Sequence, residues 1–166
     1  MLGVLNLAAE KAGWGQSLPP GIGRGVSVQL AMGTYLSQIV EVEVSKDGEV
    51  SVRRVVCALD CGAVVNPDTI AAQIEGGIIF GISAALWGEI TLKNGRVEQN
   101  NFNDYRVLRI NETPLIEVHL VKSTEAPGGI GEPGTIGIAP AMTNAIFAVT
   151  GKRIRKLPIK DQLRPV

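Results

Sequence analysis

A long β-hairpin is the pattern that most constrains how this chain can fold. From Ile39 to Ser45, valines at every second position alternate with glutamates, which is typical of a strand with one buried face. Residues 46–49, Lys-Asp-Gly-Glu, are typical of a tight turn, and residues 50–60 are then expected to form the returning strand. That strand ends with residues 55–59, Val-Val-Cys-Ala-Leu, which are apolar on both faces. We therefore expect it to lie in the centre of a sheet that is covered on both sides.

Two longer helices are expected to pack on this sheet. The first follows residues 66–68, Asn-Pro-Asp, where a capping side chain, a proline at the first helical position and an acidic residue coincide, and it should run to about Leu86. Glycines at positions 76, 77 and 81 weaken this helix, so we expect another backbone or a ligand to approach it closely there. The second helix has Pro140 in its first turn and ends at Gly151.

The remaining elements complete the fold class, which we predict as α+β, with antiparallel β-hairpins or a mixed sheet packed with two main helices. A short helix that ends at Gly13 is followed by a loop over residues 14–25, and a second hairpin turns at residues 94–95, Asn-Gly. Residues 115–121 form a further strand, on whose polar face His119 should be solvated. A final strand is expected after the last helix.

Charge and composition exclude several kinds of partner. Sixteen Lys and Arg residues balance sixteen Asp and Glu residues, which argues against binding to nucleic acid. We also expect no transmembrane segment, because no apolar stretch approaches the roughly 18–20 residues that span a bilayer. Cys57 and Cys61 would lie on the order of 13 Å apart in extended chain, too far for a disulfide, so both are expected to be reduced and buried. With His119 they do not form a metal site by their spacing.

A glycine-rich segment carries the residue best suited to chemistry. Glu132 lies in residues 128–137, Gly-Gly-Ile-Gly-Glu-Pro-Gly-Thr-Ile-Gly, immediately ahead of a helix. The glycines let a bulky group approach the backbone, and the proline that follows should push Glu132 toward an extended conformation. A carboxylate held in this way suits a general base that acts on a bound ligand. The alternative is a surface glutamate in a flexible loop.

Residues 129–134 also match the dinucleotide-binding pattern G-x-G-x-x-G. That motif requires a strand that runs directly into the first glycine, whereas residues 123–127 intervene here and Pro133 interrupts the turn. No acidic residue follows about twenty positions later. We therefore do not expect nicotinamide binding.

Several motifs in a fixed order resemble those of the molybdenum hydroxylases, the xanthine oxidase/aldehyde oxidoreductase family. Residues 131–133, Gly-Glu-Pro, ahead of an alanine-rich helix, are similar to the family's active-site signature. Residues 60–67 and 73–77 resemble the block D-x-G-x-x-x-N-P…Q-x-E-G, and residues 101–105 lie where the family has a comparable stretch. The resemblance is to the C-terminal part of the large, molybdenum-binding subunit. Within the first block the chain has Asp-Cys-Gly at residues 60–62. This sequence and residues 151–158 look most similar to the bacterial isoquinoline oxidoreductase-like and aldehyde dehydrogenase-like branch.

The resemblance implies a molybdenum–pterin cofactor in the intact enzyme and iron–sulfur clusters on a partner subunit or domain. The glutamate that matches Glu132 is the general base that takes a proton from a hydroxide ligand of the metal, and an aldehyde or an N-heterocycle is hydroxylated with water-derived oxygen. Gln73 matches a position near the pterin, and Gly131 and Gly134 would let the cofactor approach. No residue of this chain is assigned as a metal ligand. Glu75 is expected to pair structurally with a strand or cap, and Asp60 to hydrogen-bond the backbone of its turn.

The same resemblance implies a domain organisation and a set of partners. Residues 1–24 would be the end of an upstream helix and a loop, residues 25–158 the C-terminal portion of a molybdopterin-binding domain, and residues 159–166 a tail. The partners would be upstream large-subunit sequence and an iron–sulfur small subunit, so the 166-residue chain alone is expected to be inactive. Open sheet edges would allow the isolated chain to form homo-oligomers. Two alternatives stay open: a structural domain of this family without chemistry, and a small-ligand binding module that uses the glycine-rich loop at a helix start.

Overall fold

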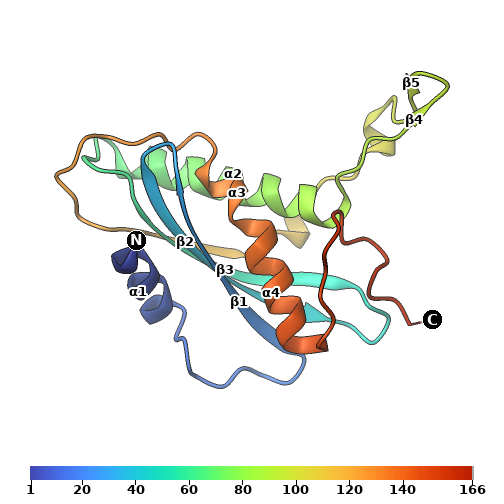
Figure 1. Ribbon diagram of the computed structural model, residues 1–166, viewed down its shortest axis with the longest axis horizontal. Helices are drawn as coiled ribbons and strands as arrows, with labels where there is room; N and C mark the ends of the chain where they lie inside the picture. The colour runs from blue at the N-terminus through green and yellow to red at the C-terminus, as the bar shows by residue number, and fades with distance from the viewer. Residues whose placement is uncertain (166) are drawn as a thin grey trace.

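The computed structural model describes residues 1–165 and has a four-stranded sheet with helices on both faces (Figure 1). The strand order is β1-β2-β3-β6. Strand β2 is antiparallel to both β1 and β3, and β6 runs parallel to β3. The elements in chain order are α1 (Leu2–Lys11), β1 (Ile22–Ala31), β2 (Thr34–Val44), β3 (Val50–Asp60), α2 (Pro67–Trp87), β4 (Leu92–Lys93), β5 (Arg96–Val97), the 3-10 helices η1 (Phe102–Asp104) and η2 (Ile110–Glu112), β6 (Leu115–Leu120), α3 (Pro133–Ile136) and α4 (Ile138–Thr150).

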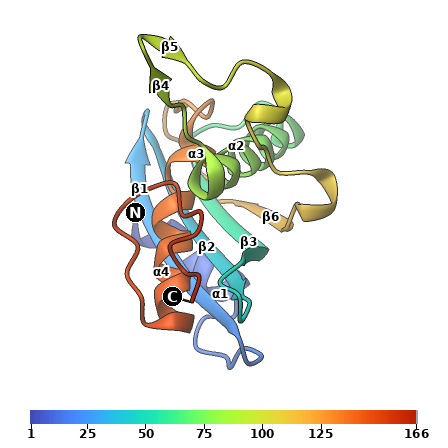
Figure 2. The ribbon, with the colours of Figure 1, turned by 90° about the vertical axis from the view of Figure 1, so that its right-hand side faces the viewer.

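The predicted central hairpin is confirmed. Strands β2 and β3 pair in antiparallel register, and β3 lies between β2 and β6. Its residues 55–59 are fully or almost fully buried because both faces of the sheet are covered. One core cluster packs β2 and β3 against α2 and α4, and a second cluster on the opposite face packs Ile39 and Val56 against α1. The hairpin at residues 94–95 is also confirmed, as β4 and β5, and it stands away from the sheet in both views (Figure 2).

Strand β1 was not predicted, and the expected loop over residues 14–25 was wrong at its end. The strand begins at Ile22 and pairs along its full length with β2. Gly23 and Gly25 face α4, where a Cβ at either position would run into backbone atoms of that helix. These glycines therefore allow close packing of α4 on the sheet and do not mark a loop.

The two main helices agree with the sequence-based boundaries. Asn66 caps α2 by accepting hydrogen bonds from the backbone N–H groups of Asp68 and Thr69. A Cβ at Gly77 would lie 3.3 Å from the backbone of α3, and one at Gly81 would lie 2.8 Å from the carbonyl oxygen of Thr135. The expected close approach is thus confirmed at both positions, whereas Gly76 faces open space.

Helix α4 ends at Gly151, whose backbone is in the left-handed region with φ of 68°. The final strand expected after it was wrong, because residues 152–165 contain no strand. Ile154, Ile159 and Leu163 are instead buried as anchors of an irregular segment. The backbone N–H of Ile159 donates to the carbonyl of Ala85, so the segment is held to the end of α2.

Helix α2 corrects the expectation about apolar stretches. It has 21 residues and a mean hydropathy of 1.5 over an 18-residue window, which is long and apolar enough to cross a membrane by length and composition. Its inner face, which carries Ile74, Ile78 and Ile82, is fully buried in the main core cluster. Packing on the sheet therefore accounts for the apolar residues of this inner face, while 39% of the window as a whole is buried.

Candidate active site

Glu132 is exposed at the start of the one-turn helix α3. The backbone N–H of Thr135 donates to its carbonyl oxygen over 2.9 Å, and this turn sets the Glu132 backbone at φ −115° and ψ −21°. The predicted extended conformation was therefore wrong, because closure of the turn outweighs the preference of a residue before proline. Within residues 1–165 the Glu132 carboxylate takes part in no hydrogen bond or ion pair, so it is available to a ligand.

Gln73, which is far from Glu132 in sequence, contacts the residue that precedes Glu132. Gln73 is exposed on α2, and its Nε2 donates to the carbonyl oxygen of Gly131 over 3.0 Å. A Cβ built at Gly131 would have no atom within 4 Å, and the same is true of Gly76. Open space therefore surrounds the backbone on both sides of this contact.

Gly134 lies in a different environment. It is buried, and a Cβ there would lie 2.9 Å from the carbonyl oxygen of Ile74. Close packing of α3 on α2 therefore accounts for glycine at this position. That Gly134 also lets a cofactor approach stays a prediction.

Side chains of the sheet hold the glycine-rich segment, and none of them was identified from the sequence. They are Ser27 and Gln29 of β1 and Thr34 and Gln38 of β2, which donate to the carbonyl oxygens of Gly137, Pro133, Gly129 and Gly134 over 2.7, 3.1, 2.8 and 2.8 Å. The available signal was a glutamine, Gln38, directly ahead of the alternating apolar stretch that begins at Ile39. It is fully buried, and such a residue must find hydrogen-bond partners in the core.

The motif at residues 60–67 runs beside the same segment. The Oδ1 atom of Asp60 accepts a hydrogen bond from the backbone N–H of Gly62 over 3.1 Å, which confirms its predicted turn role. The backbone N–H of Gly128 donates to the carbonyl oxygen of Cys61 over 2.8 Å. Glu75, by contrast, is exposed and makes no hydrogen bond or ion pair within residues 1–165, so the pairing expected for it was wrong.

The two cysteines are free and buried, as predicted. Cys57 lies in the core of β3, and burial raises the pKa of its thiol to about 12. Burial also raises the pKa of Cys61. Neither thiol is therefore suited to act as a nucleophile or as an anionic ligand near neutral pH.

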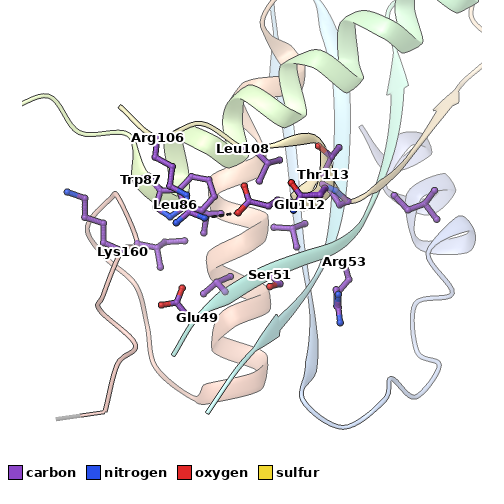
Figure 3. A pocket seen from close by; sticks show the side chains of 16 residues that line it. Glu49, Ser51, Arg53, Leu86, Trp87, Arg106, Leu108, Glu112, Thr113 and Lys160 are labelled. Atoms are coloured by element: carbon purple, nitrogen blue, oxygen red, sulfur yellow. Dashed lines mark hydrogen bonds and ion pairs between the residues drawn. The ribbon is translucent and has the colours of Figure 1, made fainter. Parts of the chain in front are cut away.

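A well-enclosed hollow lies elsewhere on the molecule. It has a volume of about 370 Å³ and sits at the C-terminal end of α2 (Figure 3). There Arg106 stacks on Trp87 at 3.9 Å from the ring centroid and pairs with Glu112 at 2.7 Å. Because Trp87 is about 21 Å along the helix from Gln73, at 1.5 Å per residue, this hollow is not part of the Glu132 site.

Neither the surroundings of Glu132 nor the hollow at the end of α2 has, within residues 1–165, side chains grouped to coordinate a metal ion. Within residues 1–165 there is no group of three or more His, Cys, Asp or Glu side chains placed to hold a metal ion. A metal near Glu132 would therefore need ligands from a cofactor or from other sequence.

Residues 13–114, which are more than half of the chain, match the sequence model of the molybdopterin cofactor-binding domain. The chain belongs to the molybdopterin cofactor-binding domain family. Among its curated relatives, the beta subunit of isoquinoline 1-oxidoreductase of Brevundimonas diminuta is 36% identical over 96% of this chain and 21% of its own length. The membrane-bound pyrroloquinoline-quinone aldehyde dehydrogenase of Gluconacetobacter polyoxogenes is 36% identical over 97% of this chain and 22% of its own length.

The fold of this molybdopterin-binding domain is also found in solved structures. Quinoline 2-oxidoreductase from Pseudomonas putida 86 superposes with a TM-score of 0.72 at 22% identity, over 80% of this chain and 19% of that one. The α+β fold class and the resemblance to molybdenum hydroxylases are therefore confirmed, as is molybdopterin as the family's cofactor. The chain spans about a fifth of the length of the curated relatives that it matches.

Proposed function

We propose that this domain contributes the general base, Glu132, to a molybdenum hydroxylase that transfers water-derived oxygen to an aldehyde or an N-heterocycle. One observation carries the proposal: the Glu132 carboxylate is exposed and unpaired within residues 1–165, while the backbone on both sides of it is held by hydrogen bonds. A free carboxylate on a fixed backbone is suited to accept a proton from a bound group. The names of the relatives, an isoquinoline oxidoreductase and an aldehyde dehydrogenase, support the two substrate classes.

The residues around Glu132 fit a bulky cofactor. Gly131 and Gly76 leave open space where side chains would otherwise stand, and the exposed Gln73 contacts Gly131 and precedes Gly76 by three residues on α2. We expect Gln73 and Gly131 to line the cofactor. When bound, the molybdenum–pterin group supplies a redox-active metal that lowers the pKa of an oxygen ligand. A carboxylate oxygen of Glu132 then accepts the proton, and the bonds to the flanking carbonyls hold the backbone that carries this side chain.

The whole active site requires more sequence than this chain contains. Glu132 and Gln73 lie on an exposed surface, not in an enclosed cavity, and the relatives are about five times longer. We expect the rest of the large subunit to close the site and an iron–sulfur small subunit to receive the electrons. The isolated 166-residue chain should accordingly be inactive.

Two alternative functions are a small-ligand binding module and a structural domain without chemistry. The charge of Glu132 argues against the first, and an experiment distinguishes the second. A phosphate-binding module is disfavoured, because the carboxylate of Glu132 stands at the start of α3, where an anionic ligand would have to lie. A structural domain without chemistry predicts that Glu132 can be replaced without loss of activity.

The test compares Glu132→Gln with wild type in the intact large subunit together with its partner. We expect turnover to fall by about 10²- to 10⁴-fold, the usual contribution of a general base, with molybdenum content unchanged. Glu10→Gln is the matched control, because Glu10 is an exposed glutamate on α1, across the sheet from Glu132. Equal turnover of the Glu132→Gln variant and wild type, at equal molybdenum content, would overturn the proposal.

A further inference from the structure

Three glutamines from three different elements hold the backbone around Glu132. Gln73 of α2 donates to the carbonyl of the residue before it, Gly131. Gln29 of β1 and Gln38 of β2 donate to the carbonyls of the two residues after it, Pro133 and Gly134, over 3.1 and 2.8 Å. All of these bonds come from side-chain amides, so their loss leaves the hydrogen bonding of strands and helices intact.

The sheet residues form a compact polar group beneath α3. Ser27 is paired directly with Gln38 in the register of β1 and β2, and Gln29 is the diagonal neighbour of Gln38 on the same face. A Cβ at Gly137 would lie 2.5 Å from Oε1 of Gln38 and 2.9 Å from both Nε2 of Gln29 and Oγ of Ser27. The start and the end of α3 therefore rest on this group, and Glu132 is the residue that caps its start.

Gln38 has a feature that stability alone does not explain. Its side chain is fully buried, yet its Oε1 atom has no hydrogen-bond partner. An unsatisfied buried acceptor is destabilising, and an apolar side chain of similar size would avoid that cost. The amide of Gln38 therefore does more than fill space: its Nε2 donates to the carbonyl oxygen of Gly134, the residue after Pro133.

We infer that Gln29 and Gln38 are positioning residues for Glu132: they fix the carbonyls after it, and so fix the backbone from which its side chain extends. This inference rests on the proposed function of Glu132. The carboxylate has no partner of its own within residues 1–165, so its placement depends on the backbone from which it extends. Small misplacement of a reacting group lowers the rate of the chemical step much more than it weakens binding.

The test uses Gln38→Met in the intact large subunit with its partner, because methionine keeps the length and volume of glutamine without its amide. We expect kcat to fall about tenfold, with KM and molybdenum content close to wild type. Hydrogen–deuterium exchange of the backbone amides in residues 131–137 should become faster, while exchange in β3 stays the same. Gln29→Met, at a less buried position, should show the same pattern and serves if Gln38→Met fails to fold.

The control is Ser37→Ala. Ser37 is buried next to Gln38 on β2 and donates to the carbonyl of Ser27, but on the opposite face of the sheet. The Ser37→Ala substitution removes this buried hydrogen bond, and Ser37 makes no hydrogen bond to the segment that carries Glu132. Its kcat and the exchange of residues 131–137 should match those of wild type.

A double variant separates this inference from the proposed function. If Gln38 acts through Glu132, adding Gln38→Met to Glu132→Gln should lower kcat no further. A further tenfold loss of kcat in the double variant would show that Gln38 acts elsewhere. Wild-type kcat in both Gln38→Met and Gln29→Met would overturn the inference. If Glu132→Gln itself leaves kcat unchanged, it is the proposed function of Glu132 that fails.

Discussion

At the residue scale, Gln73 of α2 and Glu132 lie on either side of one hydrogen bond, from the Gln73 amide to the carbonyl of Gly131. Glu132 and Gln73 were both singled out from the sequence, and α2 brings Gln73 to the residue next to Glu132. The extended conformation predicted for Glu132 was wrong because it relied on one local preference. The turn closed by Thr135 is local, but the bonds from two strands that hold it are tertiary contacts that no local pattern encodes.

Gly134 gives a stability prediction at this scale. A Cβ at Gly134 would lie 2.9 Å from backbone of α2, so Gly134→Ala should force α3 away from α2 and lower the free energy of unfolding by about 1–3 kcal/mol. Gly131→Ala is the matched control, because its Cβ would meet no atom within 4 Å. Denaturant unfolding of both variants measures the difference. Equal stability of the two variants would show that Gly134 is not a packing position.

At the element scale, prediction succeeded where an element carries its own local signal. Strand β3 follows a tight-turn motif and helix α2 follows a capping motif, and their boundaries were found. Strand β1 was missed because Gly23 and Gly25 are normally signals for a loop, and their role depends on α4 more than a hundred residues later. The parallel direction of β6 also depends on the path of the intervening chain, which local sequence does not specify.

A row of charged residues crosses the sheet beneath α1 and links its four strands. Arg24 of β1 pairs with Glu41 of β2 at 2.6 Å, and Arg54 of β3 pairs with Glu117 of β6 at 2.6 Å. The two arginines also donate to carbonyl oxygens of Gly13 and Lys11, which attaches the end of α1 to the sheet. His119 lies beside Glu117 and is only 27% exposed, so the prediction that it is solvated was wrong.

The row predicts a pH dependence of stability. The hydrogen bond from Arg54 holds the pKa of Glu117 below its usual value. The stabilisation by ionised Glu117 is therefore present above the unfolded pKa of about 4.3 and is lost as the pH falls through the lower folded pKa. Glu117→Gln should reduce the free energy of unfolding at pH 7 and have a smaller effect at pH 3, as measured by urea unfolding. A difference that stays constant between these pH values would contradict the assignment, and Glu10→Gln controls for the loss of an exposed carboxylate.

At the scale of the whole molecule, large apolar side chains remain on the surface. Val65, Phe102 and Ile110 are each at least 95% exposed, and Phe80 is 68% exposed on α2. Exposed apolar side chains such as these are available for contact with other chain segments. Their exposure agrees with a domain that spans about a fifth of its relatives and presents Glu132 on an open face.

This exposure leads to a prediction for the isolated chain. The 166-residue chain supplies only one side of the site. Within residues 1–165 no group of side chains is placed to hold a metal ion. We expect the purified chain to contain no stoichiometric molybdenum and to show no turnover with aldehydes or N-heterocycles. Metal analysis after expression in a host that makes the cofactor provides the measurement. One molybdenum per chain would show that the domain binds the cofactor without further sequence.

The most direct test of the central claim is a single-turnover measurement on the intact enzyme. Wild type and Glu132→Gln, matched for molybdenum and iron content, are mixed rapidly with substrate in the absence of an electron acceptor, and reduction of the iron–sulfur clusters is followed. If Glu132 is the general base, the variant should reduce its clusters about 10²- to 10⁴-fold more slowly at saturating substrate. Equal rates of cluster reduction in the two enzymes would contradict the account and leave the glycine-rich segment with a structural role only.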